Sequence, residues 1–174
     1  KEILNGIKNY SVNARSITSK ENNIINVKAI NEKLGFVGTP YKIDTDVLTK
    51  IVKANEIPII APLGLNSENQ VYNVNADDIA TFLASSLNAR RLIMISDVAG
   101  VLDKDNNLIS EINSAKAKEM IESGVITQGM LVKINKVINI ADKVKGTVLI
   151  DGRVEHSLLY ELLSDKGSGT LFRA

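Results

Sequence analysis

Apolar residues along the chain follow two alternating patterns, and each pattern predicts a different kind of element. Runs with few polar residues, such as 57–62 and 92–95, predict buried strands, because a strand of a parallel sheet is covered on both faces. Segments with apolar residues three and four positions apart, such as 44–52 and 75–87, predict helices with one buried face. Strands alternating with such helices predict an α/β fold with a mostly parallel sheet covered on both faces.

Shorter signals of the same kinds predict the remaining elements. We expect further helices at 1–9, 115–122, 130–143 and 156–163, and further strands at 11–17, 24–27, 41–43, 71–74, 147–150 and 170–172. Polar turns are expected at 19–23 and 103–107. Asp44 and Asn75 directly precede helices and are predicted N-caps, while the two prolines of 57–62 are predicted at strand ends, because proline donates no ladder hydrogen bond.

Composition and charge exclude several classes of function. With 44% apolar and 24% charged residues, the 174 residues have the balance of a soluble globular domain. A net charge of +1 gives no basic surface for nucleic acid, and no apolar run suits a bilayer, so we expect neither partner. The absence of Cys excludes disulfides and fits a cytoplasmic location, while a single His excludes multi-His metal sites and disfavours a His-based triad.

Polar residues gather where two predicted strands end. In parallel sheets, ligands bind beyond the carboxyl ends of the strands, and both 73–77 and Asp97 lie at such ends. Lys133 falls in the first turn of its predicted helix, where a cation opposes the helix dipole at a cost of about 0.3–1 kcal/mol. A bound phosphate would compensate that charge. Taken singly, the two aspartates also suit capping roles, and the lysine suits a solvated surface position.

Together, Asp77, Asp97 and Lys133 suit phosphoryl transfer, which depends on positioning and charge neutralisation. A carboxylate acceptor, with a pKa of about 4.3, is ionised at neutral pH and needs no general base. The shortage of histidine is then expected.

Several segments carry a resemblance to the acetylglutamate kinases of the amino acid kinase family. In chain order they are Tyr72-Asn73-Val74-Asn75-Ala76-Asp77, Ser96-Asp97-Val98-Ala99-Gly100-Val101-Leu102-Asp103, Gly124-Val125-Ile126-Thr127-Gln128-Gly129-Met130, Lys133 and Ile150-Asp151-Gly152-Arg153. The likeness runs from about Gly35 to Phe172. It implies a three-layer αβα sandwich and ATP-dependent phosphorylation of the side-chain carboxylate of N-acetyl-L-glutamate in arginine biosynthesis.

The resemblance also implies roles for individual residues. Lys133 would neutralise charge on the transferring phosphoryl group, and Asp77 would orient the catalytic lysines. Substrate-binding residues would be Asn73, Asn75 and Ala76; nucleotide-binding residues would be Asp97, Val98, Ala99, Gly100, Val101, Leu102, Val125, Ile126 and Thr127. Mg²⁺ would arrive with the ATP phosphates, so we expect no dedicated protein metal site.

The chain departs from the family pattern at its start. The family's first strand with its lysine, its glycine-rich loop, a Gly-Gly segment and a substrate-binding arginine have no counterpart, and Thr18-Ser19-Lys20-Glu21 stands where a glycine precedes a Lys-Asp turn. We therefore expect residues 1–174 to form one partial amino acid kinase-like domain. In it, 1–63 would belong to the amino-acid-binding half, and 64–174 would hold the substrate-site edge and the nucleotide half. Such a chain would be a poor kinase by itself.

Regulation and specificity stay open at this point. Glu161 and Gly167 resemble effector residues of arginine-inhibited members, which makes L-arginine a candidate inhibitor, although Val148 replaces a frequent histidine. For His156 we favour a local role at a helix start. The family implies a homo-oligomer. The alternatives to an acetylglutamate kinase are another amino acid kinase, for example one acting on an aminoadipate derivative, and a non-catalytic nucleotide-binding fragment.

Overall fold

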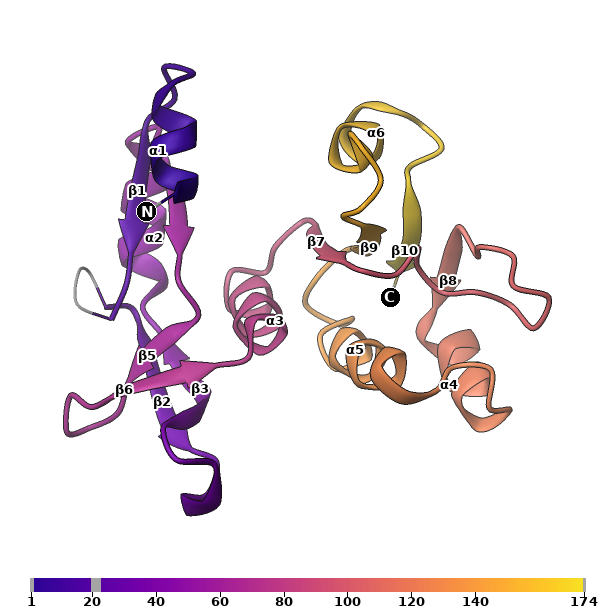
Figure 1. Cartoon of the computed structure of the whole chain (residues 1–174), viewed down its shortest axis with the longest axis horizontal. Helices are drawn as coiled ribbons and strands as arrows, with labels where there is room; N and C mark the ends of the chain where they lie inside the picture. The colour runs from indigo at the N-terminus through magenta and orange to yellow at the C-terminus, as the bar shows by residue number, and fades with distance from the viewer. Residues whose placement is uncertain (1, 20–22, 174) are drawn as a thin grey trace. The chain divides into compact units, whose positions relative to one another are not determined.

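The computed structural model describes residues 2–19 and 23–173, so residues 20–22 of the predicted turn, including Lys20 and Glu21, lie outside the described residues. The chain forms two compact units that meet in sequence between Ile79 and Ala80. Each unit has its own strands (Figure 1) and its own buried apolar residues. The division that we predict after residue 63 stays a prediction.

Unit 1 combines a two-stranded sheet with a small barrel. Its elements are α1 (Glu2–Lys8), β1 (Ala14–Ile17), β2 (Ile25–Ala29), the 3-10 helix η1 (Glu32–Leu34), β3 (Val37–Ile43), α2 (Thr45–Lys53), β4 (Ile57–Ile60), β5 (Leu63–Leu65), β6 (Val71–Val74) and the first residues of α3 (Ala76–Ser86). Strand β1 pairs in parallel with β4, while β2, β3, β6 and β5 close the barrel. Helix α1 lies along β1 and α2 lies along β4 (Figure 1).

Strand β4 differs from its prediction in two ways. It is not buried on both faces: Ile57 is exposed and the other three residues are half-buried, because β1 is its partner in a sheet of two strands. Pro58 lies inside the strand rather than at its end. The amides of Ile57 and Ala61 donate to the carbonyls of Asn13 and Ile17, each at 2.9 Å. Amides alternate in direction along a strand, so the amide of residue 58 would point away from β1. A proline at this position therefore removes no hydrogen bond to β1.

Helix α2 begins as its sequence predicts. The Oδ1 atom of Asp44 accepts the backbone N–H groups of Asp46 at 3.1 Å and Val47 at 3.3 Å, which confirms the predicted N-cap. Leu48 and Ile51 are buried, but Val52, an apolar residue within the predicted helix 44–52, is exposed. The buried stripe of this nine-residue helix is therefore narrower than the apolar pattern indicated.

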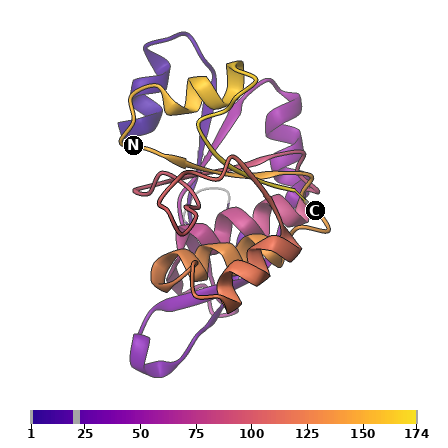
Figure 2. The same cartoon turned by 90° about the vertical axis from the view of Figure 1, so that its right-hand side faces the viewer.

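Unit 2 is built on a four-stranded sheet. Its elements are the rest of α3, β7 (Leu92–Ser96), β8 (Glu111–Asn113), α4 (Ser114–Glu122), α5 (Gln128–Ile138), β9 (Thr147–Asp151), α6 (Ser157–Leu163) and β10 (Gly169–Arg173). The strand order is β7-β9-β10-β8, with β9 and β10 antiparallel and the other two pairs parallel. Figure 2 shows α4 and α5 on one face of this sheet and α6 on the other.

The α/β class with helices on both faces of the sheet is thus confirmed. Five of the eight strand pairs within the described chain are parallel. The three antiparallel pairs make the barrel and the four-stranded sheet mixed, whereas the β1–β4 sheet is parallel. The main core of unit 2 joins the sheet to α4 and α5 and consists of Met94, Val101, Ile112, Ala117, Met120, Ile126, Ile134, Val137, Leu149 and Phe172.

One buried hydroxyl ties the loop after β7 to this core. Thr170 of β10 is 0% exposed, and its Oγ1 accepts the amide N–H of Val101 at 2.8 Å. The same hydroxyl donates to the carbonyl of Ile109 at 2.7 Å. Because both backbone groups lie far from Thr170 in sequence, the hydroxyl fixes two loop segments against one strand.

We expect Thr170→Val to destabilise the fold by about 1–3 kcal/mol, because the isosteric valine leaves a buried N–H and a buried C=O unpaired. Chemical denaturation followed by far-ultraviolet circular dichroism measures the change. Thr170→Ser is the matched control: it keeps the hydroxyl, removes one methyl group and costs about 1 kcal/mol or less. Equal losses for the two variants would contradict the role of the hydroxyl.

Candidate functional site

The carboxyl ends of β7 and β9 lie next to each other in unit 2. The two strands pair in parallel with Ser96 opposite Asp151, and the amide of Gly152 donates to the carbonyl of Ser96 at 2.7 Å. Asp97 and Arg153 therefore leave the sheet from neighbouring strands at the same edge. This is the kind of edge at which the sequence predicts a ligand site.

A pocket of about 540 Å³ opens at this edge. Its lining comes from the loop after β7, the hairpin that follows it, the segment before α5, the first turns of α5 and the turn after β9; the residues are Asp97, Val98, Ala99, Gly100, Val101, Leu102, Asp103, Asn106, Val125, Ile126, Thr127, Met130 and Arg153. All nine residues that we predict to bind nucleotide are among them. The structure thus brings two segments, 97–102 and 125–127, into one cavity.

The loop after β7 is held close to β10 by a glycine. Gly100 has φ +140°, and a Cβ built on it would lie 2.5 Å from Oγ1 of Thr170 and 2.8 Å from a methyl group of Leu108. No other residue fits that position without displacing its neighbours. The chain then continues through Val101, whose carbonyl accepts the amide of Ile109 at 2.9 Å. The pocket wall is therefore a tightly anchored backbone.

The polar turn predicted at 103–107 is confirmed, and it lines the pocket as well. Oδ1 of Asp103 accepts the amides of Asp105 at 2.8 Å and Asn107 at 2.9 Å. The hydrogen bond from the Asn107 amide is the main reason why the pKa of Asp103 lies below its ordinary value. Asp103 is therefore a carboxylate at neutral pH. Sequence reasoning treated this turn as structural and did not place Asp103 or Asn106 in the site.

The segment before α5 reaches the pocket because α4 ends sharply. Gly124 adopts φ +73°, and the amides of Val125 and Ile126 both donate back to the carbonyl of Met120, at 2.9 and 3.1 Å. Ile126 is buried in the core of unit 2. This turn, with Gly124 just after the end of the helix, sets the backbone of 125–127 along the pocket.

The prediction that Lys133 lies in the first turn of its helix is wrong. Helix α5 begins at Gln128, so Lys133 lies in its second turn. In its second turn, Lys133 meets less of the dipole field, which falls off within one turn. The side chain is half-buried, and it is not among the residues lining the pocket in the described part of unit 2. Met130, three residues earlier and on a neighbouring position of the helix surface, does line it.

Arg153 is held at the pocket by Asp151. Its Nε and Nη2 donate to the two carboxylate oxygens at 2.9 and 2.7 Å, and its backbone N–H donates to Oδ1 at 2.9 Å. These hydrogen bonds lower the pKa of Asp151, which is 7% exposed, to about 2. The same partner raises the pKa of Arg153, and the nearby charge of Asp97 adds to that rise. The sequence shows Arg153 only as the last residue of the motif Ile150-Asp151-Gly152-Arg153 and does not indicate that it lines this pocket.

The predicted substrate residues lie together in unit 1, at the junction of β6 and α3. The side chain of Asn73, near the end of β6, is exposed, and its backbone N–H donates to the carbonyl of Phe36 at 2.8 Å. Oδ1 of Asn75 accepts the amides of Asp77 at 2.9 Å and Asp78 at 3.3 Å, which confirms it as the N-cap of α3. Ala76 opens the helix. These residues and Lys133 belong to different units.

The candidate effector residues share a second pocket of unit 2, about 510 Å³ in volume. Glu161 is 8% exposed; its Oε2 accepts the amide of Ser168 at 3.0 Å, and its Oε1 lies 3.5 Å from Nη1 of Arg91. Gly167 has φ +66°, and a Cβ there would lie 2.7 Å from Oε2 of Glu161. The structure therefore brings Glu161 and Gly167 into contact distance.

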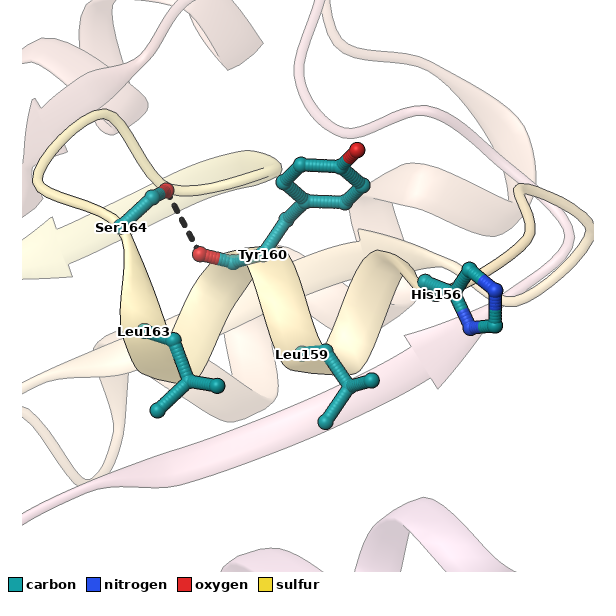
Figure 3. A pocket seen from close by; sticks show the side chains of 5 residues that line it. All are labelled: His156, Leu159, Tyr160, Leu163 and Ser164. Carbon is teal, nitrogen blue, oxygen red and sulfur yellow. Dashed lines mark hydrogen bonds between the residues drawn. The ribbon is translucent and has the colours of Figure 1, made fainter.

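His156 is the N-cap residue directly before α6 and has φ +61°, in agreement with a local role at a helix start. It also borders a mostly apolar pocket of about 380 Å³ with Leu159, Tyr160, Leu163 and Ser164 (Figure 3). Figure 3 shows Leu159 and Leu163 on the same flank of α6, and the hydroxyl of Ser164 donates to the carbonyl of Tyr160 at 2.6 Å.

The described residues contain neither a cluster of metal-binding side chains nor a helix suited to a membrane. Among them, no three or more His, Asp or Glu side chains are arranged to hold a metal ion. No helix within residues 2–19 and 23–173 has the length and apolar character needed to cross a bilayer.

Known proteins resemble this chain in sequence and in fold. The amino acid kinase family matches residues 3–150. The acetylglutamate kinase of Pelagibacter ubique is 55% identical over 174 residues, which cover 99% of this chain and 60% of that protein. The chain thus spans about three fifths of this relative's length.

Two solved structures have similar folds. The protein smu.665 from Streptococcus mutans matches with a TM-score of 0.79 and 26% identity, over 98% of this chain and 64% of that one. The N-acetylglutamate synthase from Neisseria gonorrhoeae, complexed with coenzyme A and L-arginine, matches with a TM-score of 0.82 and 22% identity, over 93% and 38%. At that identity, the second likeness shows the fold alone.

We expect Asp151→Asn to change how stability depends on pH. Because the folded-state pKa of Asp151, about 2, lies below its ordinary value, the carboxylate stabilises the fold above about pH 5 and loses this effect as the pH falls towards about 2. The wild type should therefore melt at a higher temperature than Asp151→Asn at neutral pH, and the difference should shrink steadily on acidification.

Thermal melts between neutral pH and about pH 2 test this expectation. Asp142→Asn, which removes the same charge at an exposed position, is the control and should show no comparable trend. A difference that stays constant over the whole range would show that Asp151 acts by packing and not by its charge.

Proposed function

Because the chain belongs to the amino acid kinase family, we propose that it contributes to an acetylglutamate kinase, a transferase that moves the γ-phosphoryl group of ATP to the side-chain carboxylate of N-acetyl-L-glutamate in arginine biosynthesis. The observation that carries this proposal is the 55% identity, over 99% of the chain, to the acetylglutamate kinase of Pelagibacter ubique. A cytoplasmic location and a homo-oligomeric state remain predictions from the sequence.

The pocket at the β7–β9 edge would hold ATP. Its volume of about 540 Å³ falls within the range of about 300–1,000 Å³ that is usual for small-molecule sites. Val98, Val101 and Met130 give it an apolar wall suited to a base, while Asp97 and Arg153 give it a polar edge. Mg²⁺ would bind through the phosphates of ATP, which usually supply most of its ligands in kinases.

The proposed reaction needs no base from the protein. A carboxylate oxygen of N-acetyl-L-glutamate attacks the γ-phosphorus, the bond from that phosphorus to the bridging oxygen breaks, and ADP leaves with the electron pair. The product is an acyl phosphate. In this proposal Lys133 neutralises charge on the transferring group, Asp77 orients the catalytic lysines, and Asn73, Asn75 and Ala76 contact the acylated amino acid.

We expect Lys133→Ala to lower the rate of transfer by about 10²–10³, the usual effect of removing one charge-stabilising group from such a site. The substitution is made in a fusion of these 174 residues to the part of the Pelagibacter ubique relative that they do not match. Hydroxylamine traps the acyl phosphate as a coloured hydroxamate, which measures the rate. Lys143→Ala, at an exposed position after α5, is the control.

Each alternative predicts a different result in that assay. Binding of ATP without any hydroxamate would favour a non-catalytic nucleotide-binding protein. Faster transfer to N-acetyl-aminoadipate than to N-acetyl-L-glutamate would favour the other acylamino acid kinase. A rate for Lys133→Ala equal to that of the parent would remove Lys133 from the mechanism.

We further propose that the pocket of Glu161 and Gly167 binds L-arginine as an inhibitor. The observation in favour is a buried carboxylate that already pairs with a guanidinium, that of Arg91, at 3.5 Å. A free arginine presents the same group and would replace this long ion pair with a shorter one.

L-arginine should therefore raise the melting temperature of the chain, and Glu161→Gln should abolish most of the shift. L-citrulline, which is nearly isosteric but neutral at the side chain, is the matched control ligand and should have no effect. Equal shifts with both ligands, or no shift with arginine, would exclude this pocket as an arginine site.

A further inference from the structure

Arg153 is an oriented guanidinium rather than a mobile surface side chain. Its side chain is 67% exposed, whereas that of its partner Asp151 is 10% exposed. The two side-chain hydrogen bonds to Asp151 use Nε–H and one N–H of Nη2. Arginine has five such N–H groups, so three remain for another acceptor. A buried carboxylate thus holds an exposed donor edge in a defined direction at the pocket.

Asp97 supplies an acceptor beside this donor. The two residues follow strands that pair at Ser96 and Asp151, and both line the same pocket. The charge of Asp97 affects Arg153, which places the two groups within electrostatic range. Yet within the described chain, Arg153 forms its ion pair with Asp151, and the hydroxyl of Ser96 donates to Asp97 at 3.2 Å. The carboxylate and the guanidinium therefore stand close without bonding to each other.

A pair of hydroxyl groups is the ligand chemistry that fits such an arrangement. One hydroxyl can donate to the carboxylate of Asp97, and its neighbour can accept from the guanidinium of Arg153. A phosphate fits less well, because Asp97 and Asp103 both line the pocket as carboxylates and repel an anion. A carboxylate at the end of a strand that binds ribose hydroxyls is a recurring device in nucleotide sites.

We propose that Asp97 and Arg153 together bind the two ribose hydroxyls of the nucleotide, with Asp151 as the residue that positions Arg153. This inference rests on the proposed nucleotide site and adds a specificity to it: the pocket selects ribonucleotides over nucleotides that lack the hydroxyls. The base then lies against the apolar wall of the pocket, and the phosphates extend away from the two carboxylates.

Calorimetry with the 174-residue chain tests the inference, with ATP and 2′,3′-dideoxy-ATP as the two probes, each with Mg²⁺. We expect the wild type to bind ATP at least about tenfold more tightly, because hydrogen bonds to charged groups are worth that much or more. Arg153→Ala and Asp97→Ala should each weaken ATP binding about tenfold and leave dideoxy-ATP binding unchanged. The two affinities then converge in both variants.

Asp151→Asn tests the positioning role separately. It keeps the guanidinium but removes the charge that orients it, so discrimination between the two nucleotides should fall while dideoxy-ATP binding stays the same. Arg153→Lys should behave likewise, because an ammonium group cannot form the paired hydrogen bonds to Asp151. Arg90→Ala, which removes an exposed arginine outside the pocket, is the matched control and should leave both affinities unchanged.

The possible failures are distinguishable. If the wild type binds both nucleotides equally well, the ribose inference is wrong and the nucleotide site stands. If the wild type binds neither, the proposed nucleotide site is itself wrong. If Arg153→Ala and Arg153→Lys weaken both nucleotides by the same factor, with melting temperatures unchanged, Arg153 acts through general charge and not through the hydroxyls.

Discussion

The parallel pairing of β7 with β9 is the constraint on which the site in unit 2 depends. All five residues of β9 are buried, and each faces one residue of β7 in register. Because both faces of β9 are buried, a slip of one residue would exchange the side chains packed on the two faces, so packing on both faces fixes the register. Because the register is fixed, Asp97 and Arg153 leave the sheet at one edge. The hydroxyl of Thr170 accepts the backbone N–H of Val101 and so fixes the loop after β7. The pocket is therefore lined by segments whose positions are set by the core of unit 2.

The sequence could predict most elements, and it grouped residues that the structure places in one pocket. The apolar patterns located the helices of unit 2 and its strands β7, β9 and β10, but not the three-residue strand β8. The family motifs named nine residues that the structure gathers in one pocket. Asp103, Asn106, Met130 and Arg153 also line this pocket and were not predicted to do so. For Asp103, Asn106 and Arg153 there is a physical reason. Their place depends on a hairpin and on a carboxylate–guanidinium pair, and neither leaves an apolar pattern in the sequence. The motif Asp151-Gly152-Arg153 was the available signal, since two opposite charges two residues apart suit a local ion pair.

The errors share a cause. Lys133 was assigned to a first turn because the predicted helix began at Met130. Helix α5 instead begins at Gln128 with φ +48°, a conformation that a glutamine in the sequence does not predict. Strand β4 was predicted to be buried on both faces from its apolar residues, but burial depends on how many strands flank it. Composition reports which residues tolerate burial, while the number of neighbours is a property of the assembled sheet.

Pro58 has a consequence for self-association. An edge strand with free amides is a template on which another chain can add by backbone hydrogen bonding. Residues 58 and 60 of β4 are the ones whose backbone N–H groups would point away from β1. Residue 58 is proline and has no N–H, so one of these two donors is missing. An incoming strand would find one donor along a four-residue edge, which is too few to hold its register. Within residues 2–19 and 23–173, Pro58 therefore leaves this edge of β4 with fewer donors for an added strand than its length would otherwise provide.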